Sequence, residues 1–221
     1  MRMTRSLAAA ALVFLAACSR SGTLYGDILV QTRSGTVDRA PRINVLAIPA
    51  TEVFEREWAA AVAAFLAEVG PARRAQKAAT DAAQEVRLAW DKSLAARGSG
   101  RGGTSRRIRL SWMSTQDRQV WSQVLAAEDR VFKAKGRVWE IARKHDLLAV
   151  ALLDKYTAQR VLTDENGHYV LAGVPGGKGY LYARFPIGER TLVWFRPVEV
   201  RGRPQQVDLT EANAGGWPFV P

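Results

Sequence analysis

Hydrophobic and polar positions follow two different patterns along the chain. From Thr23 to Ala50, apolar residues alternate with polar ones or form short runs, which predicts strands over TLYGDILVQT and INVLAIPA. From Thr51 onward they recur at a spacing of three and four, which predicts helices. The strand pattern returns at Val161 and continues to about Leu209, with a turn predicted at Asp164-Glu165-Asn166-Gly167 that leads into Tyr169 and Leu171. The expected order is therefore strands, then helices, then strands.

Two helical stretches are expected on either side of the Gly-rich segment 98–105, GSGRGGTS. The first begins with Thr51 as its N-cap and is expected to stop or kink at Gly70-Pro71, because proline has no amide hydrogen to donate. The second begins with a predicted capping box of Ser114 and Asp117. Two continuous arms of about 40 residues would form an antiparallel hairpin roughly 60 Å long. A chain reversal at Pro71 would give a compact three- or four-helix bundle instead, and we favour the hairpin.

Each helical stretch carries an apolar stripe that we expect to form the core. Four tryptophans lie on these stripes and are predicted to be buried, namely Trp58, Trp90, Trp121 and Trp139. Trp112 lies outside any clear stripe and is a candidate contact residue. The i,i+4 pairs Asp129–Lys133 and Glu140–Lys144 indicate a solvated outer face. The end of the second stretch, LLAVALLDKY, is apolar almost all round, so we expect it to be buried against another element.

The N-terminus has the pattern of an export signal. Arg2 and Arg5 precede an unbroken apolar run from Leu7 to Ala17. A charged start, an apolar core and small residues at the cleavage point predict a secretory signal peptide over residues 1–17. The apolar run is too short to span a bilayer as a helix, which needs roughly 20 residues.

The string Leu15-Ala16-Ala17-Cys18 resembles the lipobox of bacterial lipoproteins. The resemblance implies that Cys18 is acylated with palmitate-type chains and becomes the first residue of the mature protein. It also implies, from Ser19 rather than Asp at the next position, retention at the outer membrane, on a face that the sequence does not specify. A plain signal peptide followed by a buried thiol is the alternative.

The charge of the chain limits the classes of partner that we expect, and its cysteine content limits the kinds of site. The chain has 32 basic and 21 acidic residues, a net charge of +11, and loss of residues 1–17 would remove two arginines and leave +9. A basic chain usually suggests nucleic acid, but export makes anionic lipid headgroups, lipopolysaccharide or acidic polysaccharide the expected anions, with solubility alone as the alternative. The chain has one cysteine and two histidines, so we expect no disulfide, no zinc site and no cofactor.

Motifs on both sides of the helices resemble the carboxypeptidase regulatory-like domain. After the helices these are Thr163-Asp164, Asn166-Gly167-His168-Tyr169, Gly173-Val174-Pro175-Gly176-Gly177 and Tyr180; before them, 22–28 and 40–45 match the family's opening strands. The resemblance implies a small transthyretin-like β-sandwich that is non-catalytic and serves as a folding or interaction unit. The main departure is an insertion of some 100 helical residues where the family has a short loop.

These patterns predict an α+β protein, a small transthyretin/prealbumin-like antiparallel β-sandwich with a long inserted α-helical hairpin or small helical bundle. The expected segments are a lipoprotein signal peptide (1–17), the lipidated N-terminus with the first strands (18–50), the helical insertion (51–158), the remaining strands (159–211) and a C-terminal tail (212–221).

Candidate chemistry is sparse. Residues 98–103 match the letters G-x-G-x-x-G, but a helix and not a strand precedes them, so no dinucleotide site is expected. Gly176-Gly177-Lys178 lacks the Ser or Thr of a phosphate-binding loop, and His145 and His168 stand in no metal or catalytic motif. The remaining candidate site is a set of five arginines that could bind an anion. They are Arg97, Arg101, Arg106, Arg107 and Arg109. The alternative is that these residues form a solvated loop without a ligand.

Three functions follow as hypotheses. The first is a non-enzymatic envelope protein, anchored in the membrane through lipidated Cys18, that presents its helices to an envelope protein partner. The second is a binding module for an anionic glycan or lipopolysaccharide that uses the Arg-rich loop. The third is a hydrolase with an unrecognised site. Nucleic acid is not an expected partner.

Overall fold

The computed structural model describes residues 21–31, 36–96, 114–188 and 190–221. These residues divide into two compact units. The first contains the strands and comprises the described residues up to Pro49 together with 158–192 and 196–214. The second contains two long helices (50–157), together with 193–195 and 215–221. The protein is therefore of mixed α and β class.

One sheet of the first unit is built around β1 (Gly22–Gln31), in which buried and half-buried side chains alternate. The strands β2 (Val37–Arg39) and β5 (His168–Val174) pair with β1 in antiparallel orientation. Two short strands, β8 (Gln205–Gln206) and β9 (Leu209–Thr210), run parallel to β1. The expectation of an antiparallel sandwich is therefore wrong at these two strands, because the last part of the chain runs along β1 in the same direction.

The other sheet has the order β4 (Gln159–Leu162), β3 (Asn44–Pro49), β6 (Gly177–Ile187) and β7 (Arg190–Val200). β3 is antiparallel to both of its neighbours. Both sheets contribute to the core of the unit, in which the following side chains are at most 1% exposed: Leu24, Ile28, Val45, Ala47, Tyr169, Leu181, Ala183 and Leu209. The unit is therefore sandwich-like.

The turn before β5 confirms the local prediction from the sequence. The Asp164 carboxylate accepts hydrogen bonds from the backbone amides of Asn166 at 2.8 Å and His168 at 2.9 Å. Gly167 has a φ of 71°, in the left-handed region that a side chain disfavours. The carboxylate and the glycine together turn the chain into β5.

Glycine is also required where the C-terminal strands approach β1. A Cβ atom on Gly26 would lie only 2.3 Å from the carbonyl oxygen of Val207. The same carbonyl accepts a hydrogen bond from the buried hydroxyl of Tyr169. Burial raises the pKa of Tyr169 well above its usual value, so this hydroxyl stays protonated and keeps its donor role.

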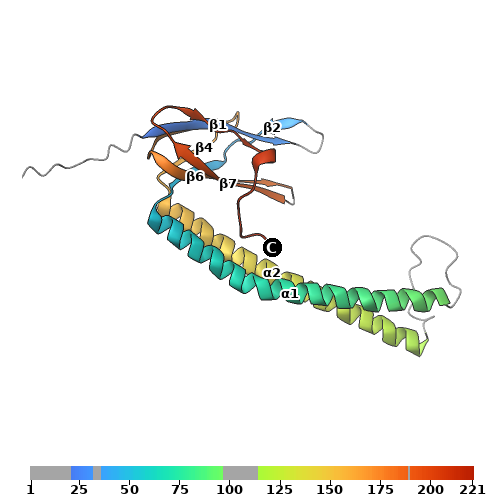
Figure 1. The fold of residues 1–221 in the computed structure, drawn as a ribbon. Coiled ribbons are helices and arrows are strands. Elements are labelled where there is room, and N and C mark those ends of the chain that lie inside the picture. Colours follow the sequence, from blue (N-terminus) through green and yellow to red (C-terminus); the bar gives the residue numbers. More distant parts are fainter. Residues whose placement is uncertain (1–20, 32–35, 97–113, 189) are drawn as a thin grey trace, which may run out of the picture. The chain divides into compact units, whose positions relative to one another are not determined.

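The second unit is built on α1 (Glu52–Ala96) and α2 (Thr115–Tyr156), which lie side by side (Figure 1). Both predicted N-caps are confirmed. The Thr51 hydroxyl accepts from the amide of Phe54 at 3.2 Å, and Ser114 forms a capping box with Asp117. Three ion pairs between the helices show that they are antiparallel, because the residue number on α2 falls as the residue number on α1 rises. These pairs are Glu57–Lys155, Glu68–Lys144 and Arg87–Glu128.

The predicted stop at Gly70-Pro71 is wrong, because α1 continues through Pro71. Pro71 is exposed, while its neighbours Val69 and Ala72 are turned inward. Packing of the long helix against α2 outweighs the cost of one proline, which is about 3 kcal/mol in a helix interior. Two continuous antiparallel helices correspond to the hairpin rather than to the bundle. Among the described residues, no helix is apolar and long enough to cross a membrane.

Candidate interaction surface

The two helices contact each other through a regular seam. On each helix, inward positions alternate at spacings of three and four residues, which is the heptad pattern of a coiled coil. On α1 they include Phe65, Val69, Ala72, Gln76, Ala79, Ala83, Val86 and Trp90, and on α2 Val124, Ala127, Val131, Ala134, Val138, Ile141 and His145. The alanines in the middle of the seam allow the backbones to approach closely.

The C-terminal segment packs on this helical pair. Trp217 and Phe219 are 7% and 3% exposed, and both rings contact Trp58, with centroid distances of 5.5 and 5.4 Å. Phe195 also stands against Trp58, at 4.5 Å. The Trp217 indole donates a hydrogen bond to the Asp146 carboxylate at 2.8 Å. Residues expected only to form an irregular tail therefore complete an aromatic core.

A charged cluster lies next to these rings. The Glu68 carboxylate accepts hydrogen bonds from Lys144 at 2.7 Å and contacts His145 Nε2 at 2.9 Å. The hydrogen bond from Lys144, followed by that from His145, lowers the pKa of Glu68 from its ordinary 4.5 to about 2. The buried His145 ring is flanked by Phe65 and Phe219, at centroid distances of 5.5 and 6.4 Å. The His145 ring of this pair is therefore packed into the aromatic core, while the Glu68 side chain remains 32% exposed.

The expected pair Glu140–Lys144 is not formed. Lys144 reaches across to Glu68, and Glu140 pairs with Arg137 at 3.4 Å on its own helix. A partner on the other helix thus replaces the local one. The other expected pair, Asp129–Lys133, is present at 2.8 Å.

Opposite the seam, α2 presents an exposed apolar ridge of Leu125, Phe132 and Trp139. Their exposed fractions are 50%, 76% and 64%. The three residues are seven positions apart, so they lie along one line of the helix surface, about 21 Å from first to last. Large aromatic side chains with this exposure are uncommon on a monomer and mark interaction sites when they are contiguous. We call Leu125, Phe132 and Trp139 the α2 ridge.

The ridge corrects the expectation that Trp139 belongs to the core. In the sequence, each ridge residue directly follows an apolar neighbour, Val124, Val131 or Val138. Adjacent residues on a helix point about 100° apart, so only one of each pair can face α1. The valines occupy the seam, which leaves the larger residue of each pair outside. The apolar pairs recur every seven residues, and this spacing is the sequence signal that could have predicted two separate apolar stripes on α2.

The other predicted core tryptophans behave differently from Trp139. Trp90 is 3% exposed, whereas Trp58 and Trp121 are half-buried. The apolar end of α2 is also less buried than expected, because Leu147 and Leu148 are 61% and 58% exposed. The inward residues there are Ala149 and Leu153, which continue the face of α2 that packs on α1.

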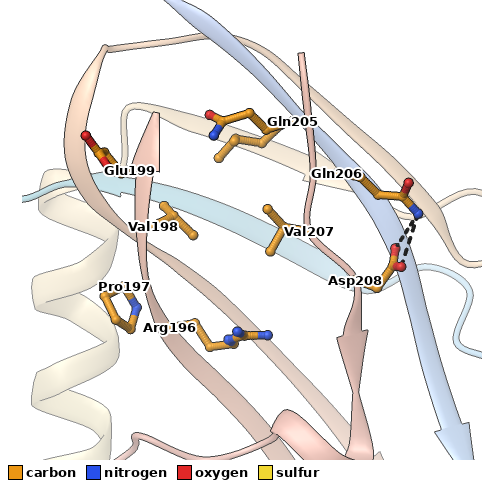
Figure 2. Close-up of a pocket in the computed structure, with 9 residues that line it drawn as sticks. Arg196, Pro197, Val198, Glu199, Gln205, Gln206, Val207 and Asp208 are labelled. Carbon is orange, nitrogen blue, oxygen red and sulfur yellow. Dashed lines mark hydrogen bonds between the residues drawn. The ribbon is translucent and has the colours of Figure 1, made fainter. Parts of the chain in front are cut away.

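The strand-bearing unit has a shallow polar cavity of about 350 Å³ (Figure 2). It is lined by Leu24, Arg196, Pro197, Val198, Glu199, Gln205, Gln206, Val207 and Asp208. Several of its polar groups bind one another or the chain. Glu199 pairs with Arg201, Gln205 accepts from the amide of Arg201, and Gln206 donates to Asp208. These contacts hold the rim of the cavity together.

The helical unit contains a second cavity, of about 430 Å³. It lies between α1 and α2 and is lined by Ala82, Val86, Ser122, Gln123, Ala126, Ala127 and Arg130. Its lining has no acidic residue and a single cation, so it offers no acid–base pair.

The site residues predicted from sequence lie outside the described part of the chain. This applies to Cys18, to Trp112 and to the five arginines Arg97, Arg101, Arg106, Arg107 and Arg109. Of the two histidines, His145 is the buried residue of the helical pair, and His168 contacts Asp27 at 3.2 Å in the sheet. Within the described residues, no group of three or more His, Cys, Asp or Glu side chains could hold a metal ion.

The fold and this surface define a mixed α and β protein in which a strand-bearing unit is combined with a two-stranded antiparallel helical hairpin. No protein-family model matches the chain, and no curated protein matches it.

Two solved structures show a distant likeness. One is a Pseudomonas aeruginosa protein with a proposed carbohydrate-binding role, at 13% identity over 87% of this chain and 90% of that one, with a TM-score of 0.34. The other is the pilus backbone of Streptococcus pneumoniae, at 12% identity over 81% of this chain and 34% of that one, with a TM-score of 0.26. The chain thus spans about a third of the pilus protein's length, and neither likeness is strong enough to assign a fold or a function.

Proposed function

We propose that this chain is a non-enzymatic, lipid-anchored protein of a bacterial cell envelope whose helical hairpin binds a protein partner through the α2 ridge. The observation that carries the proposal is the exposure of Phe132 and Trp139, at 76% and 64%, on a helix whose opposite face is already buried. Exposed aromatic side chains contribute most of the binding free energy in many protein interfaces. Transfer of these apolar rings from water into an interface is favourable, which provides free energy for binding a partner.

The anchor rests on the chemistry of Cys18 and its surroundings. An apolar run ending in Leu15-Ala16-Ala17-Cys18 supplies both an export signal and an acylation site. β1 begins at Gly22, so the connection to Cys18 spans at most roughly 15 Å. Acylation by two or more chains gives stable membrane attachment. The strand-bearing unit of such a protein stays close to the membrane surface, and Ser19 favours the outer membrane.

The strand-bearing unit is proposed to be a transthyretin-like sandwich of the carboxypeptidase regulatory-like kind. Its two motif segments support this assignment by their position. Asn166-Gly167 forms the turn that enters β5, Gly173-Val174 ends β5, and Pro175-Gly176 connects β5 to β6. In this proposal the sandwich is the carrier of the helical hairpin and has no catalytic role.

A cross-linking experiment in the producing cell tests the proposal. Trp139 is replaced by p-benzoyl-phenylalanine, a photo-reactive residue of similar size, in the full chain. Leu148 is the matched control, since it is 58% exposed on the same helix but points about 160° away from Phe132, the central residue of the ridge. Irradiation should give a discrete protein adduct at Trp139 and not at Leu148. The proposal is wrong if the two positions give the same result, whether adducts or none.

The alternative is a binding module for an anionic glycan or lipopolysaccharide. It rests on the charge of the five arginines, since guanidinium groups bind phosphates and carboxylates in bidentate fashion. Replacement of Arg97, Arg101, Arg106, Arg107 and Arg109 by Ala should abolish salt-sensitive retention of the full chain on immobilised lipopolysaccharide. Retention that equals that of the unmodified chain would eliminate this alternative.

A further inference from the structure

The α2 ridge is symmetric about its central residue. Leu125 precedes Phe132 by seven residues and Trp139 follows it by seven. We propose that the ridge binds the same ridge of a second copy of this chain, with the two α2 helices antiparallel and Phe132 at the twofold axis. The inference rests on the proposed function, because it names the partner of that same surface.

The antiparallel arrangement joins a small residue to a large one. Leu125 of one copy meets Trp139 of the other at each end, and the two Phe132 rings meet in the centre. In this twofold interface the Leu125–Trp139 contact occurs twice, once on each side of the axis, and the Phe132–Phe132 contact occurs once, on the axis. A parallel arrangement would instead stack Trp139 on Trp139 and Leu125 on Leu125, with poorer volume matching.

The charges beside the ridge are complementary under the same symmetry. Glu128 lies four residues before Phe132 and Lys135 three residues after it, and both stand roughly 40–60° to the same side of the ridge. A twofold axis through Phe132 therefore brings Glu128 of each copy to within one residue step, about 1.5 Å along the axis, of Lys135 of the other. Opposite charges meet twice, once at each side of the axis, and like charges do not.

Gly136 is a second indication that a helix approaches here. Glycine in a helix interior is less favourable than alanine by about 1 kcal/mol. A Cβ atom on Gly136 would meet no atom within 4 Å, so nothing in the described part of the chain requires a glycine at this position. Gly136 lies one turn after Phe132, beside the ridge. A missing side chain there lets a partner helix come close, as small residues do at other helix interfaces.

Acidic residues near the ridge favour a protein over a lipid surface. A helix that binds anionic lipid has basic residues along both edges of its apolar face. Here Glu128, Asp129 and Glu140 stand within about 80° of the ridge, interspersed with Lys133 and Lys135. A surface that carries both acidic and basic residues is complementary to another surface of mixed charge, and the same ridge on a second copy of the chain is such a surface.

Site-directed cross-linking tests the register. Full-length variants with Phe132→Cys, Leu125→Cys or Trp139→Cys are treated with a bis-maleimide that bridges helices about 8–10 Å apart. Phe132→Cys should cross-link to itself. Leu125→Cys should not, because two copies of it lie about 21 Å apart along the axis. A mixture of the Leu125→Cys and Trp139→Cys variants should cross-link, and the chain with Cys18 alone is the control. Self-cross-linking at all three positions would show a parallel pair and overturn the proposed register.

Substitutions test the energetics by sedimentation equilibrium of the full chain in detergent. Phe132→Asp should raise the dimer dissociation constant at least tenfold, whereas the matched control Leu148→Asp should leave it unchanged. Helical circular dichroism verifies that both variants fold. Glu128→Lys and Lys135→Glu should each weaken the dimer, and the double reversal should restore it. A role within one chain would not be restored in this way, since the partner of Glu128 there is Arg87.

The outcomes separate this inference from the proposed function. Adducts at Trp139 to another protein, with a chain that stays monomeric, would retain the ridge as an interface and overturn self-association. Ridge-dependent sedimentation with vesicles containing phosphatidylglycerol, again without a dimer, would overturn both. A monomeric chain that gives no adduct at Trp139 would also overturn both.

Discussion

Removal of the Phe219 ring should weaken the whole helical unit. Phe219 is 3% exposed, and its ring lies 5.4 Å from both Trp58 and Phe65 and 5.3 Å from Trp217. Truncation of a buried Phe to Ala costs about 3–5 kcal/mol. We expect about 3 kcal/mol for Phe219→Ala, at the lower end, because Phe219 lies outside the helices and strands and its backbone can move to fill part of the cavity.

Urea unfolding followed by helical circular dichroism measures this change, and tryptophan fluorescence reports whether Trp217 becomes exposed to water. For a chain of this size, 3 kcal/mol corresponds to a fall in melting temperature of roughly 6–12 °C. Val220→Ala is the matched control, since the adjacent Val220 is 50% exposed and should change stability by no more than about 0.5 kcal/mol. A loss below about 1 kcal/mol for Phe219→Ala would show that the C-terminal segment does not support the helices.

Three further predictions concern single positions. Pro71→Ala should stabilise the chain by about 1–3 kcal/mol, because it restores an amide donor inside α1 at an exposed position; an unchanged urea midpoint would contradict this. Gly26→Ala should destabilise the sheet, because its Cβ would lie 2.3 Å from a carbonyl oxygen, whereas Gly136→Ala should stabilise α2 by about 1 kcal/mol, because alanine is the better helix former and its Cβ meets no atom; equal effects of the two changes on unfolding would refute the close approach. The hydrogen bond from Lys144 lowers the pKa of Glu68 to about 2, so its stabilising effect should be complete above pH 4.5 and disappear as the pH falls toward 2. The difference in stability between the unmodified chain and Glu68→Gln should follow that curve, and a difference that persists at pH 2 would contradict it.

Local signals in the sequence predicted local structure well. Thr51 and Ser114 begin the two helices, as their side-chain oxygens predicted, since capping depends only on residues within one turn. The turn at Asp164 and Gly167 was predicted for the same reason. These features involve atoms that are close in sequence, so no distant part of the chain decides them.

Features that depend on distant residues were predicted less well. Pro71 disfavours an isolated helix, but α1 remains continuous through it and packs against α2. Lys144 was assigned to Glu140 on its own helix, whereas Glu68 on the other helix binds it. The aromatic tail was expected to be irregular, and its backbone is irregular, but Trp217 is buried. In each case a contact across many residues of sequence outweighs a local preference.

The α2 ridge shows where this division falls. The sequence by itself determined that α2 is a helix and that apolar pairs recur along it every seven residues. Only the tertiary structure decided which member of each pair is buried. The valine of each pair packs against α1, because the alanine-rich seam brings the two helix backbones close and leaves room between them only for small side chains. Phe132 and Trp139 then remain outside, since residues adjacent on a helix point about 100° apart.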